Sequence, residues 1–387
     1  MKKATLLLLC GAFAVCACQQ DPVPEAPSKD AELTGEKVDV AAFSTAARKV
    51  FVLNEGGLGS NNATLDFLRL PEGTYVNGAF RRMNPDAGAG LGDVGNDIAV
   101  HDDEVWIVVN NSGIVEVLSA KDETEIAAIT VPTPRNIAFD EQYAYVTSWA
   151  GAYATYDSNY MVTDSKNPKG QVHRINLATK KVEGSVEVGY QPEGIACYDG
   201  KLYVANSGGI ASQLPPDYAY DKTVSIIDTK SFQVTQTVDV QVNLKNVYSD
   251  GLGTIYVTTL GNYWDVHSGL YQLSASNPAA PKHIADYVSV SAISGDTLYC
   301  IGTESEYDWS VLSHEYKAWR VRSGAKKDLA LEVNTTALYS LAALNADTFL
   351  VGDAGDYYNP GTVSCYSKDT KIWSVTAGVC PGHFAVY

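Results

Sequence analysis

The residues best suited to contact a ligand are eleven aromatic side chains, which occur in five separate loop-like segments. Each segment contains Gly, Asp, Asn or Pro and lies between two short apolar runs. Tyrosine and tryptophan offer rigid, amphipathic contact area with few rotamers to freeze, which suits binding. The eleven are Tyr153, Tyr156, Tyr160, Tyr218, Tyr220, Tyr263, Trp264, Tyr307, Trp309, Tyr357 and Tyr358. The alternative is that long loops use these rings as small cores of their own.

Polar side chains occur at the ends of the same apolar runs. Asn54, Asn110 and Asn206 follow three runs, Asp353 lies near the end of another, and Arg135 begins one. Amide, carboxylate and guanidinium groups at such places could orient the amides, hydroxyls or phosphate of a ligand. The same residue types also cap loops and form turns, so the sequence leaves both interpretations open.

Catalytic and metal-binding motifs are not found. The six histidines lack metal-ligand spacing, and there is no nucleophile elbow or phosphate-binding loop. "GLGDVG" (90–95) fits a dinucleotide-binding pattern but precedes an expected strand instead of a helix. The carboxylates Asp93, Asp97, Glu193 and Asp353 leave a Ca²⁺ site open, although their spacing does not resemble an EF-hand loop. We therefore expect a non-catalytic protein without a cofactor or bound metal.

The elements that must position these residues are short strands. "KLYVAN" (201–206) and "KTVSIID" (222–228) are rich in β-branched residues and are separated by turn residues. No convincing amphipathic helix is found. One strand type, with an aromatic residue before a small or branched run, recurs seven times. Its aromatic residues are Phe51, Trp106, Tyr145, Tyr203, Tyr256, Tyr299 and Phe349. We interpret these rings as structural, packing one repeat against the next.

The repeat unit is four antiparallel strands in about fifty residues, which is the pattern of a propeller blade. The sequence therefore predicts an all-β, seven-bladed β-propeller over residues 49–387. The strand around Phe51 has no short apolar strand before it, and "GHFAVY" (382–387) has no strand after it. We expect residues 382–387 to be the innermost strand of the blade formed by residues 49–80, which closes the ring and removes an open sheet edge.

The two faces of such a ring carry different loops. With strands named A to D from the axis outward, antiparallel connection places the A–B and C–D loops on one face and the B–C and D–A loops on the other. The expected A–B and C–D loops are short and polar, whereas all the aromatic segments are B–C loops. The sequence thus predicts a ligand-binding face made by the B–C and D–A loops, called the upper face below.

The first residues predict export and lipid attachment. "MKKATLLLLCGAFAVCAC" has two lysines, an apolar run too short for a spanning helix, and a cysteine where a lipoprotein signal is cut. We expect a signal peptide over residues 1–17 and acylation of Cys18, with palmitate among the acyl groups; an ordinary signal peptide cut nearby is the alternative. Residues 18–48 are polar, acidic and proline-bearing, and we expect a disordered tether.

The charge and the cysteines exclude several classes of protein. The chain has a net charge of −17, and loss of Lys2 and Lys3 with the signal peptide gives −17 − 2 = −19. Such a chain repels nucleic acid and anionic membrane surfaces, and no basic cluster offsets this. The later cysteines form no C-x-x-C pair, which favours buried free thiols over disulfides or a metal site. They are Cys197, Cys300, Cys365 and Cys380.

These features together resemble the YncE-like β-propellers. "PEGIACYDGKLYVANSGG" (192–209), "KTVSIIDTKSFQV" (222–234), the lipoprotein signal, the acidic tether and the aromatic B–C loops support this resemblance, which covers the whole chain. More narrowly, the chain is similar to BtuG-type surface lipoproteins of gut bacteria. That resemblance implies a lipid-anchored outer-membrane surface protein that binds cobalamin (vitamin B12) or related corrinoids and passes them to a TonB-dependent transporter. Capture of another ligand such as a glycan, and a carboxylate-dependent lyase or hydrolase, remain open as alternatives.

Overall fold

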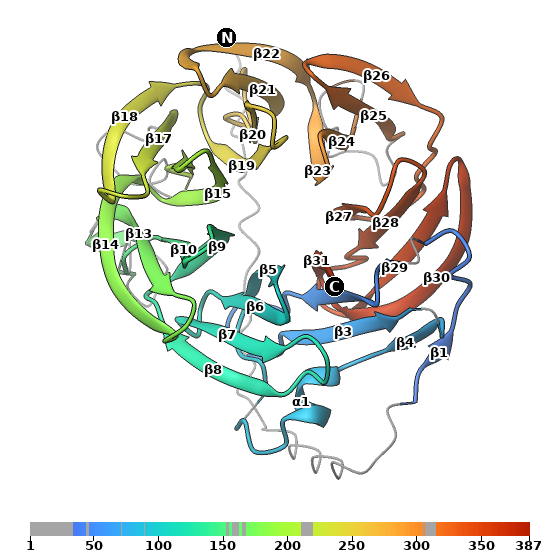
Figure 1. The fold of residues 1–387 in the computed structure, drawn as a ribbon. Coiled ribbons are helices and arrows are strands. Elements are labelled where there is room, and N and C mark those ends of the chain that lie inside the picture. Colours follow the sequence, from blue (N-terminus) through green and yellow to red (C-terminus); the bar gives the residue numbers. More distant parts are fainter. Residues whose placement is uncertain are drawn as a thin grey trace.

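The protein is a ring of seven β-sheets around a central axis, seen in the computed structural model in Figure 1. The structure describes residues 34–43, 46–70, 72–88, 90–151, 155–156, 162–164, 168–209, 220–303, 305 and 315–387. Each sheet is one blade of four antiparallel strands, except the first, which has five. The prediction of a seven-bladed propeller is confirmed.

Each blade contains four strands, A to D, in order from the central axis to the outer rim. Blades are numbered 1 to 7 from the one that contains β2, and the strands are given below in that order. The A strands, nearest the axis, are β31 (Pro381–Val386), β5 (Gly95–His101), β9 (Pro134–Phe139), β15 (Pro192–Tyr198), β19 (Leu244–Ser249), β23 (Val288–Ser294) and β27 (Leu338–Ala343). The B strands are β2 (Lys49–Asn54), β6 (Glu104–Val109), β10 (Tyr143–Ser148), β16 (Lys201–Asn206), β20 (Thr254–Thr259), β24 (Thr297–Gly302) and β28 (Thr348–Asp353). The C strands are β3 (Thr64–Arg69), β7 (Ile114–Ser119), β13 (Lys169–Asn176), β17 (Thr223–Asp228), β21 (Gly269–Ser274), β25 (Lys317–Arg322) and β29 (Pro360–Ser367). The D strands are β4 (Thr74–Val76), β8 (Glu125–Thr130), β14 (Lys181–Tyr190), β18 (Gln233–Asp239), β22 (Asn277–Asp286), β26 (Ala325–Leu329) and β30 (Thr370–Val379).

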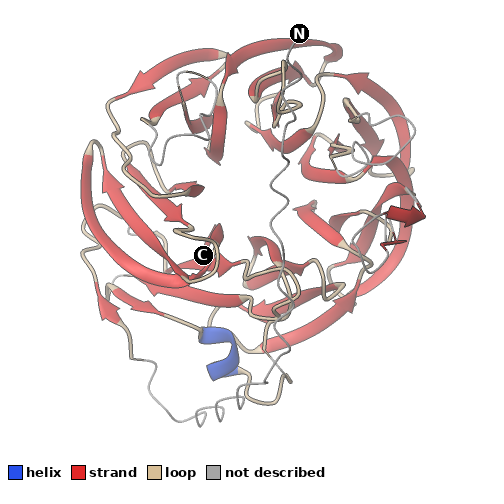
Figure 2. Cartoon of the chain, turned by 180° about the vertical axis from the view of Figure 1, so that it is seen from behind, coloured by secondary structure: helices blue, strands red, loops and turns tan. Residues whose placement is uncertain are grey.

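Two small elements interrupt this repeat. The helix α1 (Ala79–Met83) lies between β4 and β5, outside the ring beside blade 1 (Figure 2). The strands β11 (Thr155–Tyr156) and β12 (Val162–Asp164) form a hairpin in the B–C loop of blade 3. The sequence analysis predicted neither, because both are too short to show a periodicity. No helix in the described part of the chain has the length and apolar character needed to cross a bilayer.

The ring closes by pairing the two ends of the propeller in blade 1. β31 is antiparallel to β2, with Val50 opposite Val386 and Val52 opposite Phe384. In Figure 1 the red β31 lies beside the blue ribbon at the N-terminal end of the propeller. The backbone N–H of Arg48 donates to the carbonyl of Tyr387 at 2.6 Å, which places the two ends side by side. The predicted closure is confirmed.

The segment before the propeller differs from the prediction. β1 (Glu36–Lys37) pairs with β4 and is the fifth strand of blade 1. Val38, Val40 and Phe43 pack against the hydrophobic cluster between blades 7 and 1. The prediction of disorder is therefore wrong for residues 34–43, here called the N-terminal arm, because three apolar side chains among the acidic residues give the arm surface to bury.

The N-terminal arm runs along the lower ends of blades 7 and 1. Its Ala42 carbonyl accepts a hydrogen bond from Thr348 Oγ1 at 2.9 Å, and its Asp39 carbonyl accepts one from Trp373 Nε1 at 2.7 Å. Thr348 begins β28 directly after an A–B loop. The arm therefore crosses the blade junction on the face opposite the B–C loops.

The hydrophobic core is divided into seven clusters, one at each junction between neighbouring blades. Six of the seven predicted aromatic residues have the expected structural role. Phe51, Trp106, Tyr145, Tyr203 and Tyr256 are 0% exposed, and Tyr299 is 4% exposed. Each of the six packs toward the following blade.

The seventh, Phe349, was assigned one residue out of register. Asp353 opposes Leu338 as Gly302 opposes Val288, so Phe349 is equivalent to Leu298. A one-residue shift reverses the face of a strand side chain. Phe349 accordingly packs on Tyr299 of the preceding blade, with ring centroids 5.3 Å apart. Leu350 takes the equivalent place toward blade 1.

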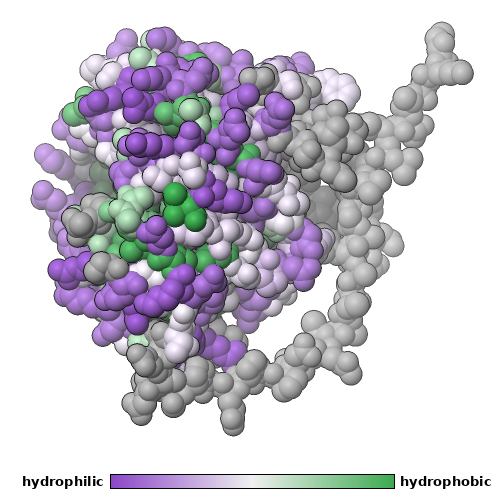
Figure 3. Space-filling view, turned by 90° about the vertical axis from the view of Figure 1, so that its right-hand side faces the viewer, coloured by the Kyte–Doolittle hydropathy of each residue, from purple (hydrophilic) through white to green (hydrophobic). Residues whose placement is uncertain are grey.

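The outer surface of the ring is mostly polar. Figure 3 shows the side that bears blades 6 and 7, where hydrophobic patches are small and separated by hydrophilic atoms. This agrees with β26, in which the first four residues are exposed. The four cysteines beyond Cys18 are free, as predicted; Cys197 is half-buried and the other three are buried.

One buried carboxyl in blade 2 gives a pH-dependent prediction. Glu116 is 6% exposed, and its Oε2 has no hydrogen-bond partner among the described residues. Burial, with a smaller effect of the nearby Glu125, raises the pKa of Glu116 to about 7. Because its pKa is raised in the folded state, the native protein favours protonated Glu116 and loses stability as the pH rises from about 4.5 to about 7.

We therefore expect Glu116→Gln to match the wild type near pH 4.5 and to be more stable above pH 7, by up to roughly 3 kcal/mol. Denaturant unfolding at pH 4.5, 6, 7 and 8.5 measures the difference. The matched control is Glu183→Gln, which changes an exposed acidic side chain in β14 and should leave the stability unchanged at every pH. A pH-independent effect of Glu116→Gln would contradict the prediction.

Candidate functional site

Every A strand begins with a β-bulge at the upper face. In β9, Pro134 opposes Ser148 but Ile137 opposes Val146, so the inner strand has one extra residue. The other six A strands show the same register shift at their starts. A bulge redirects a side chain and is common beside functional sites. Seven equivalent bulges therefore form a ring of redirected positions around the upper mouth of the axis.

The bulge positions line a central cavity of about 670 Å³. We call them the axial ring, and they are Asn96, Arg135, Glu193, Lys245, Ser289, Tyr339 and Gly382. Gly382 has no side chain to contribute. A Cβ there would collide with Glu55, which follows β2 and also lines the cavity. Glu55 thus fills the place of the missing seventh side chain.

The backbone just before the axial ring is strained. In six of the seven blades, the non-glycine residue before the A strand has a positive φ. These residues are Val94 (63°), Thr133 (39°), Gln191 (46°), Asn243 (58°), Tyr287 (60°) and Cys380 (53°). The left-handed region disfavours side-chain-bearing residues, above all β-branched Val94 and Thr133. Such strain clusters at functional sites, which supports the axial ring as the candidate site.

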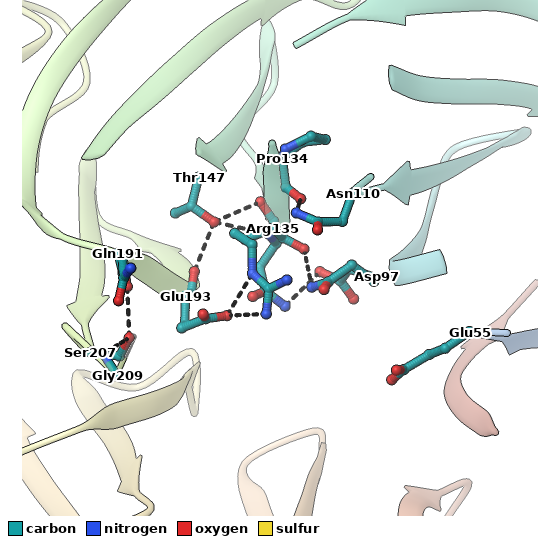
Figure 4. A network of polar contacts seen from close by, with 12 residues as sticks. Glu55, Asp97, Asn110, Pro134, Arg135, Thr147, Gln191, Glu193, Ser207 and Gly209 are labelled. Atoms are coloured by element: carbon teal, nitrogen blue, oxygen red, sulfur yellow. Dashed lines mark hydrogen bonds and ion pairs between the residues drawn. The ribbon is translucent and has the colours of Figure 1, made fainter. Parts of the chain in front are cut away.

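Arg135 is held in one position within the axial ring. Its Nε and Nη2 lie 3.0 and 2.9 Å from Glu193 Oε2, and its guanidinium carbon lies 4.5 Å from the Trp149 ring centroid. Thr147 Oγ1 donates to the backbone carbonyl of Glu193 at 2.8 Å. Figure 4 shows Arg135 and Glu193 joined across two neighbouring A strands. The pair presents hydrogen-bonding groups to the cavity with its charges largely neutralised.

The pKa values of Asp97 and Glu55 are shifted in opposite directions. Asp97 accepts hydrogen bonds from the Ile137 N–H at 2.9 Å and from Asn136 Nδ2 at 3.2 Å. Burial nevertheless raises the pKa of Asp97. In Figure 4, Glu55 points into the same central space from the neighbouring blade 1.

Glu55 is a carboxylate held by two partners. Tyr339 OH donates to its Oε2 at 2.6 Å, and His383 Nε2 lies 3.0 Å from its Oε1. Burial raises the pKa of Glu55, but hydrogen bonds from His383 and Tyr339 and the positive charges of His383 and Lys245 outweigh burial, so its pKa is lowered. The upper end of the central cavity therefore combines hydrogen-bond donors and acceptors held in place by neighbouring residues, with both positively and negatively charged groups.

Four of the predicted aromatic residues are exposed above this ring. Trp264 and Tyr358 are each 78% exposed, Tyr263 is 68% exposed, and Tyr357 is 51% exposed. Tyr220 is half-buried. Together with Tyr263, it lines a second pocket of about 360 Å³. That pocket shares Arg135, Glu193 and Lys245 with the central cavity. A third pocket of about 350 Å³ is lined by Tyr263, Trp264 and His267.

The remaining aromatic predictions fall on parts of the chain that the structure does not place. Tyr153, Tyr160, Tyr218, Tyr307 and Trp309 lie outside the described residues, and for Tyr156 only the backbone in β11 is described. The signal peptide and the acylation site Cys18 also lie outside the described residues. Those assignments stay predictions.

Two of the five predicted polar residues have no accessible surface. Asn54 and Asn206 are both 0% exposed. Asn206 Nδ2 donates to Thr223 Oγ1 at 3.0 Å and to Ser225 Oγ at 2.9 Å, and Asn54 Nδ2 donates to Thr64 Oγ1 at 3.0 Å. In this structure these amides bind within their own blades and lie beneath the ligand-accessible surface.

Two more of the polar residues shape loops. Asn110 Nδ2 donates to the Pro134 carbonyl at 2.8 Å. Asp353 accepts hydrogen bonds from three backbone N–H groups, those of Thr336, Ala337 and Gly355. Of the five polar residues that the sequence indicated, Arg135 is the one that lines the central cavity.

The sequence analysis missed most of the axial ring. Asn96, Lys245, Ser289 and Tyr339 were not singled out, nor were Glu55 and His383. The signal was present in the repeats, because "NDIAV", "RNIAF", "EGIAC", "KNVYS" and "YSLAA" each begin with the bulge residue. The residue type at that first position differs from repeat to repeat, whereas apolar residues recur at the positions after it. Such variation indicates a ligand-facing position instead of a core position.

The four carboxylates considered for a Ca²⁺ site do not form a cluster in the structure. Asp93 accepts hydrogen bonds from the Gly59 N–H and from Asn111, and Asp353 caps the loop described above. Glu193 pairs with Arg135. Across the described ranges, no three His, Cys, Asp or Glu side chains lie close enough to hold a metal ion.

Comparison with known proteins supports the fold alone. No family model matches the chain, and no curated protein matches it in sequence. Among solved structures it is similar to a chain of Kuenenia stuttgartiensis hydrazine synthase, with a TM-score of 0.56 and 14% identity. That match covers 75% of this chain and 88% of the other. Matches extend to 880 solved chains, and a fold shared so widely selects no activity by itself.

Proposed function

We propose that the protein is a non-catalytic propeller that captures a broad amphipathic molecule on its upper face, namely cobalamin or a related corrinoid. The supporting observation is the exposure of Tyr263, Trp264, Tyr357 and Tyr358 above the axial ring. Among the described residues, each strongly exposed aromatic side chain lies at the upper end of its blade. Exposed aromatic groups confined to one face favour a binding surface over chance exposure.

The chemistry of the upper face suits a corrinoid. The ligand has a flat macrocycle, several amide side chains and one phosphate. Tyr263 and Trp264 offer flat apolar surface, while Asn96 and Ser289 offer hydrogen bonds at the cavity. The resemblance to cobalamin-capturing surface lipoproteins also supports the proposal, through the lipoprotein signal and the acidic tether as well as the aromatic loops.

The N-terminal arm supports a capture role at a membrane surface. It lies at the lower ends of blades 7 and 1, so an anchor attached ahead of it leaves the upper face uncovered. We propose acylation at Cys18, outer-membrane attachment, and transfer of the ligand to a TonB-dependent transporter.

The test is titration of the exported chain, from residue 19 onward, with cyanocobalamin. We expect saturable binding at micromolar concentration or below, seen in the heat of binding and in the visible absorbance of the ligand. A panel of oligosaccharides is titrated in parallel. Absence of cyanocobalamin binding would overturn the corrinoid proposal, and saturable binding of a glycan would then identify the other ligand class.

A further inference from the structure

We propose that Lys245 is the subsite for a phosphate group on a ligand that also carries a flat ring system. This rests on the proposed function in one respect, that the upper face binds a small molecule. It goes further by naming the anionic group, its partner on the protein and the place where the two meet.

Lys245 stands at the junction of two pockets. It is the second residue of β19, at the bulge of blade 5, and it lines both the central cavity and the second pocket. The backbone on either side is fixed. Asn243 Nδ2 donates to the Gly261 carbonyl at 2.9 Å, and the Asn246 N–H donates to Thr258 Oγ1 at 3.0 Å. The side chain of Lys245 therefore extends from a backbone held by hydrogen bonds into the space where the central cavity and the second pocket meet.

The positive charge of Lys245 acts on nearby Glu55, whose pKa it helps to lower, but its ammonium group is not in an ion pair with any described residue. Arg135 is paired with Glu193, but Lys245 makes no ion pair within the described part of the chain. In a protein with 45 acidic and 28 basic residues, an unpaired cation at the mouth of a cavity is a distinctive feature. Such a group attracts the anionic part of a ligand.

Uncommitted hydrogen-bond donors lie beside it. Asn246 and Ser289 line the central cavity with Lys245, and their side chains form no hydrogen bond within the described residues. A phosphate has several acceptor oxygens, so it can accept from an ammonium, an amide and a hydroxyl at once. These three donors suit the negative charge and the acceptor oxygens of a phosphate.

The ring-binding part of the subsite comes from the same blade. Tyr263, in the B–C loop of blade 5, lines the second pocket with Lys245 and the third pocket with Trp264. Tyr220 lines the second pocket from blade 4. A flat ring placed on these aromatic side chains brings an attached phosphate toward Lys245. The arrangement therefore fits one molecule that carries both groups.

The experiment uses two pairs of ligands that differ only in phosphate: cobinamide phosphate with cobinamide, and flavin mononucleotide with riboflavin. Each is titrated against the exported chain and its Lys245→Gln and Lys245→Arg variants. We expect the phosphorylated member to bind roughly 10-fold or more tightly to the wild type. Lys245→Gln should remove this preference without weakening the unphosphorylated member, and Lys245→Arg should retain most of it.

Lys201→Gln is the matched control, because Lys201 is an exposed lysine that begins β16 at the lower face. It should leave the phosphate preference unchanged. Melting curves of all variants should coincide with that of the wild type, since Lys245 is exposed.

The outcomes separate this inference from the proposed function. If the corrinoid pair binds without a phosphate preference, or the preference survives in Lys245→Gln, the subsite is wrong and the function stands. If only the flavin pair binds, and Lys245 sets its phosphate preference, the corrinoid proposal is wrong and the subsite stands. Failure of all four ligands to bind overturns both.

Discussion

Deletion of residues 381–387 is expected to destabilise the whole propeller. The deletion removes β31, which pairs with β2 and supplies buried Ala385 and half-buried Phe384 to the two junctions of blade 1. It also removes His383 from Glu55. Truncation of a large core side chain costs about 3–5 kcal/mol, and this deletion removes a half-buried phenylalanine together with the backbone pairing of a whole strand, against a total stability of roughly 5–15 kcal/mol. We expect melting at least ~10 °C earlier, or aggregation through the exposed edge of β2.

A rearranged chain is the control for this deletion. Residues 381–387 are moved in front of Arg48 and joined to it by a two-residue turn, as the A and B strands of blade 2 are joined by Asp102 and Asp103. The Arg48 N–H already donates to the Tyr387 carbonyl, so a short turn spans the gap. Since the rearranged chain lacks the N-terminal arm, its reference is a chain that begins at Arg48. The two should melt together. Unchanged melting of the deleted chain would show that β31 does not close the ring.

The fold could be predicted from the sequence because each blade repeats the same local pattern. A B strand with an aromatic residue after a tight turn recurs with little variation. The burial of that aromatic ring at the junction with the next blade can therefore be predicted from the local sequence alone. The misassigned Phe349 shows the limit of that reasoning. Two adjacent apolar residues, Phe349 and Leu350, both fit the pattern, and only the pairing of Asp353 with Leu338 decides between them.

The site was harder to predict because its chemistry comes from bulges. A bulge is an irregularity of pairing between two strands, so the residue it redirects cannot be identified from one strand alone. Lys245 and Tyr339 therefore look like ordinary strand residues in the sequence. The sequence suggests that Asn54 and Asn206 lie at the opening of the central cavity, but both are buried and form hydrogen bonds within their own blades. Exposed aromatic residues in loops were easier to find, because composition alone marks them.

The combined substitution Tyr263→Ala and Trp264→Ala is expected to weaken ligand binding by about 2 kcal/mol or more, which is roughly thirty-fold. Both side chains line the third pocket, and Tyr263 also lines the second pocket beside Lys245. Flat aromatic rings that lie on the ligand exclude water from the contact surface, and their removal exposes that surface to water. Loss of contact area acts mainly on the dissociation rate, so we expect faster release with a nearly unchanged association rate. Stopped-flow measurement with cyanocobalamin separates the two rates.

The matched control for this substitution lies in the same blade on the opposite face. Leu252, in the A–B loop of blade 5, is 71% exposed, close to the 78% exposure of Trp264. Leu252→Ala removes a similarly exposed apolar side chain and should leave both rates unchanged. Neither variant removes a buried group, so both should melt like the wild type. If Leu252→Ala weakens binding as much as the aromatic pair does, the effect is not specific to the upper face. Unaltered release from the double variant would contradict the prediction, because it would show that the ligand does not lie on Tyr263 and Trp264, two of the most exposed aromatic side chains in the described part of the chain.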